Sequence, residues 1–317
     1  MKQNIVTVTL NPAIDQTIIL NGITLGKVNI AQNVHKSPGG KGINVASCLA
    51  DWGLSANATG FLGKANINPF EILFQSKHII DSFIRLEGET RVNIKLSDIL
   101  KGETTDINLA GLKMTNDHFQ ELLKYLKNIV NEKSIVVLAG SVPEGLAADS
   151  YAQIIKIIKK LGAWVLLDTS GKPLKESLSV KEKYLPNCIK PNQHELSQLA
   201  QKTLLTQDDI LQFALSLQEK GIENVVVSLG ENGSLFINKK YAMHAALPPI
   251  KTISSVGAGD ALVAGLIAGF HGNLQFEQIA KLAVAFSVAK LGHIGPHLPN
   301  INEVKKYVEK VKVTLLK

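Results

Sequence analysis

The stretch Val256–Gly265 (VGAGDALVAG) joins a glycine-rich turn to an apolar run, with one carboxylate, Asp260, at the junction. Gly257 and Gly259 have no Cβ, so the backbone can bend sharply there and direct its N–H groups toward an oxygen anion. The apolar run over 261–268 is typical of a buried helix, whose start carries unpaired N–H donors and a positive dipole end. The turn therefore suits a phosphoryl group, and Asp260 suits a base that deprotonates the attacking hydroxyl.

The same stretch also has a purely structural interpretation. A Gly-Ala-Gly-Asp turn can be a tight connection in which Asp260 caps the helix. The stretch is not the dinucleotide-binding fingerprint, because Leu262 occupies the position of the third glycine. Each motif described below has a similar structural alternative, and none of them decides the function alone.

A second group of candidate residues lies near the N-terminus. Gly39–Asn44 (GGKGIN) places three glycines at an expected helix start, and Asn44 offers donors and an acceptor to sugar hydroxyls. The segment is not a Walker A loop, because glycine follows Lys41. Asp15 comes just after the expected strand 5–10, where ligand sites of open α/β sheets gather, and it can accept hydrogen bonds from two hydroxyls. A glycine-rich turn and a turn aspartate are the structural alternatives.

Two further motifs suggest a nucleotide. In Lys190–Glu195 (KPNQHE), Asn192 and Glu195 have the spacing of a capping box, but they could also hold waters around a nucleotide's Mg²⁺. Ser228–Gly233 (SLGENG) follows an expected strand and is either a hairpin turn or a loop that receives phosphates.

Arg91 is one of only two arginines in the chain. On a lid strand, its guanidinium could clamp a substrate phosphate through two parallel hydrogen bonds, with help from Lys27 or Lys41. The alternative is an exposed surface arginine.

Composition narrows the functional class. The chain has 34 Lys+Arg against 27 Asp+Glu, and the excess is scattered, which favours small anionic ligands over nucleic acid. The two cysteines, Cys48 and Cys188, have no metal-binding spacing and are expected to be buried thiols in a reducing compartment. No signal peptide is visible, and the longest apolar run, Ala261–Phe270, is too short to cross a membrane, so a cytoplasmic location is expected.

Hydrophobic periodicity predicts the elements that must position these residues. In the first part of the chain it predicts strands at 5–10, 17–20, 28–34, 56–62, 91–96 and 105–109, and helices at 42–52 and 68–76. In the second part it predicts strands at 135–139, 164–168, near 188, at 225–228 and at 234–237, and helices at 149–161, 172–179, 193–200, 207–219, 260–270, 276–290 and 302–312.

This order of elements predicts an α/β fold. Alternating strands and helices indicate a mostly parallel sheet covered on both faces. The short strands within 14–35 and 91–109 do not fit that rhythm and are expected to form a separate small sheet, a lid. Residues 1–317 are expected to be a single domain.

Taken together, in this order and spacing, the motifs resemble the ribokinase-like (PfkB-type) sugar kinase family. The resemblance covers essentially the whole chain, and within the family it is greatest to the branch that phosphorylates fructose 1-phosphate. The fragments that carry it are TLNPAID (9–15), GKVN (26–29), GGKGINVA (39–46), FLGK (61–64), TRVNIKL (90–96), TTDINLAG (104–111), KPNQHEL (190–196), VVSLGENGSL (226–235) and SSVGAGDALVAG (254–265).

The resemblance implies a doubly wound, mostly parallel sheet flanked by helices, with a small β-sheet lid. It also implies phosphoryl transfer from ATP, with Mg²⁺ on the ATP phosphates, to fructose 1-phosphate, giving fructose 1,6-bisphosphate. Asp260 would be the base, and the amides of Gly257, Ala258 and Gly259 the anion hole. The implied substrate-binding residues are Asp15, Lys27, Gly39, Gly40, Lys41, Asn44, Arg91 and Ser141. The implied nucleotide-binding residues are Lys190, Asn192, Glu195, Ser228, Gly230 and Gly233, with no direct metal ligand because Asn192 and Glu195 would act through water.

Some positions depart from the family pattern and leave alternatives open. Ala139–Pro143 (AGSVP) replaces the usual SGSLP but keeps Ser141, and Ser255 stands where threonine is common. Gly292–Pro296 matches only loosely, so dependence on a monovalent cation is left open. The alternatives are a tagatose-6-phosphate or fructose-6-phosphate kinase, a nucleoside kinase and a non-catalytic sugar-phosphate-binding regulator. A homodimer through the lid would fit its exposed sheet edges.

Overall fold

The computed structural model describes residues 4–248, 256–293, 295 and 297–317. From edge to edge, the strands of its main sheet are β15 (Lys312–Leu315), β14 (Ala242–Ala246), β13 (Ser234–Asn238), β12 (Asn224–Ser228), β11 (Cys188–Ile189), β10 (Trp164–Asp168), β9 (Ser134–Ala139), β1 (Asn4–Thr9), β4 (Asn57–Gly63) and β5 (Ile80–Asp81). A further short strand, β6 (Ile84–Leu86), pairs with β4 outside this order.

The central strands are parallel and covered on both faces. β1 pairs in parallel with β4 on one side and with β9 on the other, whereas β13, β14 and β15 pair antiparallel at the edge. β9 (SIVVLA) is buried at every residue, as expected for a strand that packs helices on both sides. The mostly parallel sheet predicted from the sequence is therefore confirmed.

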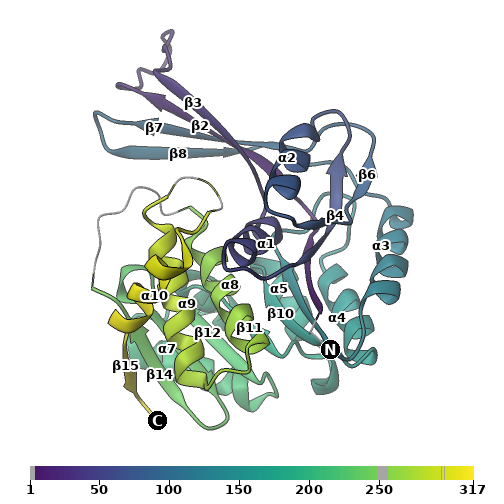
Figure 1. The fold of residues 1–317 in the computed structure, drawn as a ribbon, viewed down its shortest axis with the longest axis vertical. Coiled ribbons are helices and arrows are strands. Elements are labelled where there is room, and N and C mark those ends of the chain that lie inside the picture. Colours follow the sequence, from purple (N-terminus) through teal and green to yellow (C-terminus); the bar gives the residue numbers. More distant parts are fainter. Residues whose placement is uncertain (1–3, 249–255, 294, 296) are drawn as a thin grey trace.

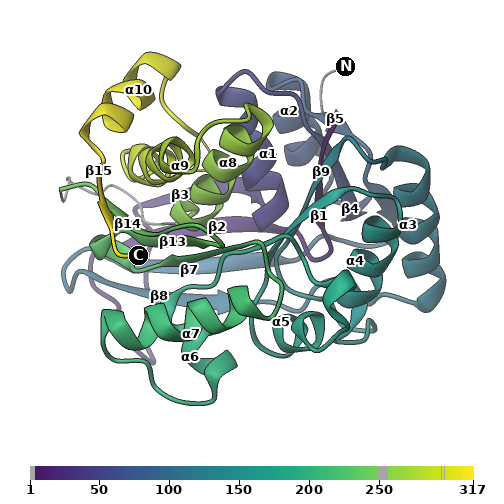
Figure 2. The same ribbon diagram turned by 90° about the horizontal axis from the view of Figure 1, so that it is seen from below.

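Helices cover both faces of the sheet, as Figure 2 shows. On one face lie α1 (Lys41–Asp51), α2 (Asn68–Ser76), α8 (Ala258–His271), α9 (Phe276–Lys290) and α10 (Ile301–Lys310). On the other lie α3 (Asn116–Ile129), α4 (Ser150–Lys160), α5 (Gly171–Leu178), α6 (Gln193–Ala200) and α7 (Gln207–Glu219). Each helical layer closes its own apolar core against the sheet. None of the described helices is long and apolar enough to cross a membrane.

A second, four-stranded sheet projects from the body in Figure 1. Its order is β3 (Asn33–Gly39), β2 (Ala13–Leu20), β7 (Val92–Asp98) and β8 (Glu103–Asn108). The separate small sheet expected from the sequence is confirmed, and we call these four strands the lid.

Some predicted elements differ from the structure. The strand predicted over 28–34 was wrong, because β3 begins at Asn33 and the preceding residues form an exposed connection in which Val28 is 94% exposed. The helix predicted over 302–312 ends at Lys310, and β15 follows it. The sequence analysis also assigned no element to α3, although Thr115 caps this helix with a capping box.

Candidate active site

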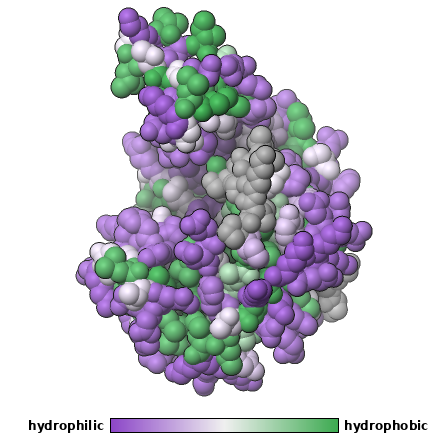
Figure 3. Space-filling view, turned by 90° about the vertical axis from the view of Figure 1, so that its left-hand side faces the viewer, coloured by the Kyte–Doolittle hydropathy of each residue, from purple (hydrophilic) through white to green (hydrophobic). Residues whose placement is uncertain are grey.

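A cavity of about 700 Å³ lies between the lid and the carboxyl ends of the central strands. Figure 3 shows the surface hollowed between the lid at the top and the body below it. β1 lies between β4 and β9 in the sheet. The strand that follows β1 in the main sheet, β4, lies on one side of it and the later strand β9 lies on the other, so the strand order reverses at β1. Open α/β sheets bind ligands at such a reversal. The candidate residues that line the cavity are Asp15, Gly40, Lys41, Asn44, Arg91, Ser141, Gly257 and Asp260.

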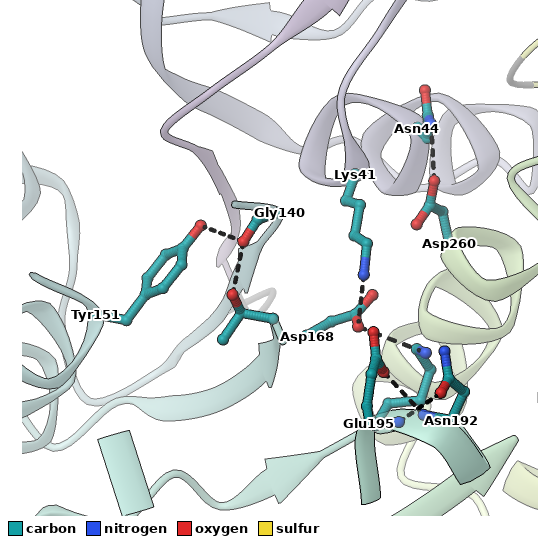
Figure 4. Close-up of polar contacts among 10 residues, drawn as sticks. Lys41, Asn44, Gly140, Tyr151, Asp168, Asn192, Glu195 and Asp260 are labelled. Carbon is teal, nitrogen blue, oxygen red and sulfur yellow. Dashed lines mark hydrogen bonds and ion pairs between the residues drawn. The ribbon is translucent and has the colours of Figure 1, made fainter. Parts of the chain in front are cut away.

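Asp260 is the third residue of α8 and is 7% exposed. Asn44, on α1, donates a hydrogen bond of 2.7 Å from Nδ2 to Asp260 Oδ2, as Figure 4 shows. Burial, helped by the nearby charge of Asp168, raises the pKa of Asp260 to about 6, although Lys41 opposes the shift. A carboxyl with that pKa is a proton acceptor at neutral pH and a stronger base than an ordinary aspartate.

The turn before α8 has the geometry that the glycines predicted. Gly257 adopts φ +82, and α8 begins without any side-chain capping bond, so Asp260 is not the N-cap of this helix. The first helical hydrogen bond runs from Ala261 N to Gly257 O, which leaves the N–H groups of the preceding residues without partners in the helix. These amides, at Gly257–Gly259, lie one turn from the carboxyl of Asp260. Ser254 and Ser255 lie outside the described residues.

Asp168, at the end of β10, was missed by the sequence analysis. Its Oδ1 atom lies 3.2 Å from Lys41 Nζ and 3.4 Å from Lys190 Nζ, and its side chain is 1% exposed. Burial opposes its ionisation, but the two lysines outweigh burial and hold the pKa of Asp168 below its ordinary value. Asp168 raises the pKa of Lys41 in turn. Its position at the carboxyl end of a correctly predicted strand could have marked Asp168 as a candidate site residue.

Asp15 and Asn93 are cross-strand neighbours in the lid. Asn93 Nδ2 donates to Asp15 Oδ1 at 3.0 Å, whereas Asn93 Oδ1 is buried and has no partner among the described residues. Burial raises the pKa of Asp15, against the hydrogen bond from Asn93 and the charge of Arg91. The hydrogen bonds that the Arg91 guanidinium makes to described residues are long, at 3.3 and 3.4 Å, and both go to backbone carbonyls. Asn93 is a further cavity residue that sequence reasoning missed.

Two glycines are needed next to these groups. A Cβ on Gly39 would lie 2.5 Å from Asp15 Oδ2, and one on Gly40, which has φ +122, would lie 2.8 Å from Thr9 Cγ2. The backbone can therefore pass this close to Asp15 and Thr9 only without side chains at these two positions. Ser141 faces the same region and accepts a hydrogen bond of 3.1 Å from Asn11.

Of the residues expected to bind the nucleotide, some have a structural explanation and others line an open groove. Asn192 and Glu195 form the capping box of α6, with both hydrogen bonds present, so their structural interpretation is confirmed. Asn192 also pairs with Ser228 and lines an open groove of about 800 Å³ together with Gly230. A Cβ on Gly233 would lie 2.3 Å from Ala245 O. Close packing against β14 is therefore sufficient to explain why this position is a glycine.

Lys27 is not brought to the cavity. It lies in the exposed connection between β2 and β3, at the far end of the lid, and it is absent from the cavity lining. Of the lysines expected to hold the substrate phosphate, only Lys41 lines the cavity in this structure.

Asn192 and Glu195 carry an amide and a carboxylate oxygen, and such oxygens are donor types that suit a hydrated magnesium ion. Among the described residues, no three His, Cys, Asp or Glu side chains are grouped as metal ligands. Asn192 and Glu195 do not line the lid cavity: Asn192 lines the open groove described above, and Glu195 lines a neighbouring pocket. Figure 4 shows the two side chains joined by the capping-box hydrogen bonds. Mg²⁺ commonly keeps several waters and binds through one or two carboxylates and the substrate's phosphates.

A buried carboxyl beside an amide turn, under a lid lined by polar side chains, is the arrangement expected of a phosphotransferase with an alcohol acceptor. The sequence pattern of the pfkB family of carbohydrate kinases matches residues 8–303. The chain belongs to this family.

Individual relatives agree with this assignment. The chain is 44% identical to a 1-phosphofructokinase of Xanthomonas campestris, over 92% of both chains. It is 34% identical to a 1-phosphofructokinase of Vibrio cholerae, over 100% of this chain and 98% of that one. Phosphofructokinase-2 of Escherichia coli, solved in complex with potassium, superposes with a TM-score of 0.89 at 28% identity and covers 97% of this chain and 98% of its own.

Proposed function

We propose that this protein transfers the γ-phosphoryl group of ATP to fructose 1-phosphate and forms fructose 1,6-bisphosphate. Nearly full-length similarity to several 1-phosphofructokinases supports the substrate. The structural observation that carries the proposal is the buried Asp260 carboxyl, held by Asn44 beside the Gly257 turn and open to the lid cavity.

The described residues support each part of this reaction. Asp260 takes the proton from the attacking hydroxyl, and the Asn44 amide keeps the carboxylate oriented while it does so. The amides of Gly257, Ala258 and Gly259 stabilise the charge that develops on the transferred group. Closure of the lid excludes water and holds the two substrates in line. When bound, Mg²⁺ neutralises and orients the ATP phosphates, and Asn192 and Glu195 would hold it through water.

On the substrate side, we assign the sugar hydroxyls to Asp15, Asn44 and the glycine backbone at Gly39 and Gly40. The hydrogen bonds of Arg91 to other described residues are long, so its guanidinium is available to the phosphate already on the sugar. Ser141 lies close to Arg91's partner Asn11 and is assigned to the same phosphate. Lys41 is positioned between the two substrates by Asp168.

On the nucleotide side, we assign Lys190, Ser228 and Gly230 to ATP. Lys190 is 4% exposed and pairs with Asp168, so it would act as a fixed positive charge beneath the phosphates. Gly230 is exposed and has open space where a Cβ would be, so a nucleotide could approach its backbone closely.

An ADP-release assay tests the substrate assignment directly. Fructose 1-phosphate, tagatose 6-phosphate and fructose 6-phosphate would be compared as acceptors at matched concentrations. We expect the largest kcat/KM for fructose 1-phosphate, and a larger value for either competitor would overturn the assignment. A free nucleoside should not be turned over, because Arg91 in the cavity would then face no phosphate.

We also propose a homodimer formed through the lid. The connection between β2 and β3 exposes Leu25, Val28 and Ile30 at 92%, 94% and 85%, and Val34 and Ile107 on the lid strands are also exposed. Exposed apolar side chains grouped on one element are typical of an interface. Lys27 lies in the same connection. It could contact a substrate phosphate if this connection folded over the cavity of its own chain, or if the connection of one copy reached the cavity of the other.

A further inference from the structure

Lys290 is the most deeply buried lysine of the described residues, at 1% exposed. It closes α9, and the ion pairs found in the described ranges do not include it. Transfer by Asp260 and the amide turn leaves this lysine without a role. A buried ammonium without a carboxylate partner therefore needs an explanation.

The contacts of Lys290 place it beneath the Gly257 turn. Its Nζ atom donates to His293 O at 2.7 Å, and His293 N donates back to Lys290 O at 3.0 Å, which closes the last turn of α9. A Cβ on Gly257 would lie 3.5 Å from Lys290 Cε, so the stem passes directly behind the turn. The carboxyl of Asp260 is close enough for its charge to act on Lys290.

This position is unfavourable for a cation unless an anion binds in front of it. Burial of an ammonium is strongly unfavourable, and the single carbonyl oxygen of His293 compensates for it only weakly. The C-terminal end of α9 favours the charge, but the N-terminal end of α8 opposes it. A methionine would fill the same space without this penalty. Positive charge here becomes favourable when a phosphoryl group sits on the amide turn.

We propose that Lys290 is a positioning residue for phosphoryl transfer, which holds the end of α9 under the Gly257 turn and adds fixed positive charge behind its amides. The proposal rests on the kinase function proposed above. Burial lowers the pKa of Lys290, and the charge of Asp260 opposes that shift and favours the ammonium form.

Two variants separate charge from packing. Lys290→Met keeps the length of the side chain and removes its charge, whereas Lys290→Ala leaves a space. Lys281→Met is the matched control, because Lys281 lies on the same helix in an exposed pair with Glu277. We expect Lys290→Met to lower kcat at least about tenfold, with little change in the sugar-phosphate KM and no loss of thermal stability. The control variant should match the wild type.

Cation rescue supplies the second readout. Ammonium or potassium chloride should restore part of the kcat of Lys290→Ala, because a small cation can enter the space. Tetramethylammonium chloride, whose cation is too large, should not, and neither salt should rescue Lys290→Met. Wild-type kcat in Lys290→Met, or unfolding of both variants without any rescue, would overturn the proposal and leave Lys290 a packing residue.

Calorimetric binding of the non-hydrolysable analogue AMP-PNP separates this proposal from the substrate assignment. Lys290→Met should bind the analogue more weakly than Lys281→Met does, whichever sugar the enzyme uses. Equal affinities would contradict the proposed charge. If the wild type turned over none of the three sugar phosphates while this difference persisted, the substrate assignment would fail and the role of Lys290 would stand.

Discussion

At the scale of the single residue, the account depends on the environment of Asp260. The carboxyl is buried and lies near a second acid, Asp168, and both effects favour the protonated form. Lys41 and the Asn44 amide counteract them, so the group titrates at about pH 6 rather than at its ordinary value of 3.8. Desolvation makes it more basic, while the hydrogen bond fixes the direction in which it accepts a proton.

The pH dependence of turnover follows from this shift. Asp260 must be deprotonated in order to act, so we expect kcat/KM to decline below about pH 6 and to approach a tenfold loss for each further pH unit. The decline should disappear from the residual activity of Asp260→Asn. A profile that stays level down to pH 5 would contradict a base with a raised pKa.

The same shift predicts an effect on stability. Between pH 3.8 and about 6 the folded carboxyl holds a proton that the unfolded chain has released, so the native state loses stability as the pH rises through this window. Above it, the ionised and desolvated carboxylate is a standing penalty. Asp260→Asn should therefore raise the thermal midpoint at pH 8, and the difference should vanish toward pH 4. A lower midpoint at pH 8 would show that the carboxylate contributes favourable contacts instead.

Arg91 should affect one substrate and not the other. Removing its guanidinium takes away the proposed phosphate-binding group, which lines the lid cavity, and leaves the proposed nucleotide-binding residues unchanged. We expect Arg91→Ala to raise the KM for the sugar phosphate far more than the KM for ATP in steady-state kinetics. Equal increases in both would remove Arg91 from the substrate site.

At the scale of the element, α8 and α9 position the amide turn. Gly265 of α8 faces α9 so closely that an added Cβ would lie 2.6 Å from Ala283 Cα. Gly265→Ala should therefore destabilise the fold by about 1–3 kcal/mol, despite the better helix propensity of alanine, because the two helices would have to separate. Denaturant unfolding measures this effect. Gly292→Ala is the control, because a Cβ there would meet only Ala289 O, at an ordinary contact distance of 3.7 Å.

Most elements could be predicted from local pattern, and the exceptions have physical reasons. The bounds of α2, α6, α7 and α9 agree with the sequence prediction. The starts of α6 and α7 are marked by capping boxes at Asn192 and Thr206. β15 is a short edge strand, and its only partner among the described strands of the sheet, β14, is distant in the sequence. α3 was not predicted, although the helical spacing of its buried residues Phe119, Leu122, Leu123 and Leu126 could have indicated it.

The site was less predictable than the elements. Motif spacing identified Asp260, Asn44 and Arg91, since each follows or faces an element whose end could be located. Asp168 and Asn93 were missed because their importance comes from partners on other strands, which spacing along the chain does not reveal. Lys27 was expected at the site from its motif alone, and the length of the lid places it elsewhere.

At the scale of the whole molecule, the lid is both the roof of the cavity and the proposed dimer interface. The single-domain organisation and the cytoplasmic location expected from the sequence stay predictions. If the lid pairs two copies, Val28→Asp should shift the protein toward a monomer in analytical ultracentrifugation, because a charge cannot be buried cheaply there. Lys113→Asp, exposed outside the lid, is the control. A wild type that is monomeric at assay concentration would contradict the proposal.

The most direct test of the account is the turnover of Asp260→Asn, measured with saturating ATP and sugar phosphate and with its fold checked by circular dichroism. General base catalysis typically contributes ~10²–10⁴-fold, so we predict a folded variant whose kcat is lower by at least about a hundredfold. A folded variant with near-normal kcat would show that the proton leaves by another route and that the amide turn does not work with this carboxylate.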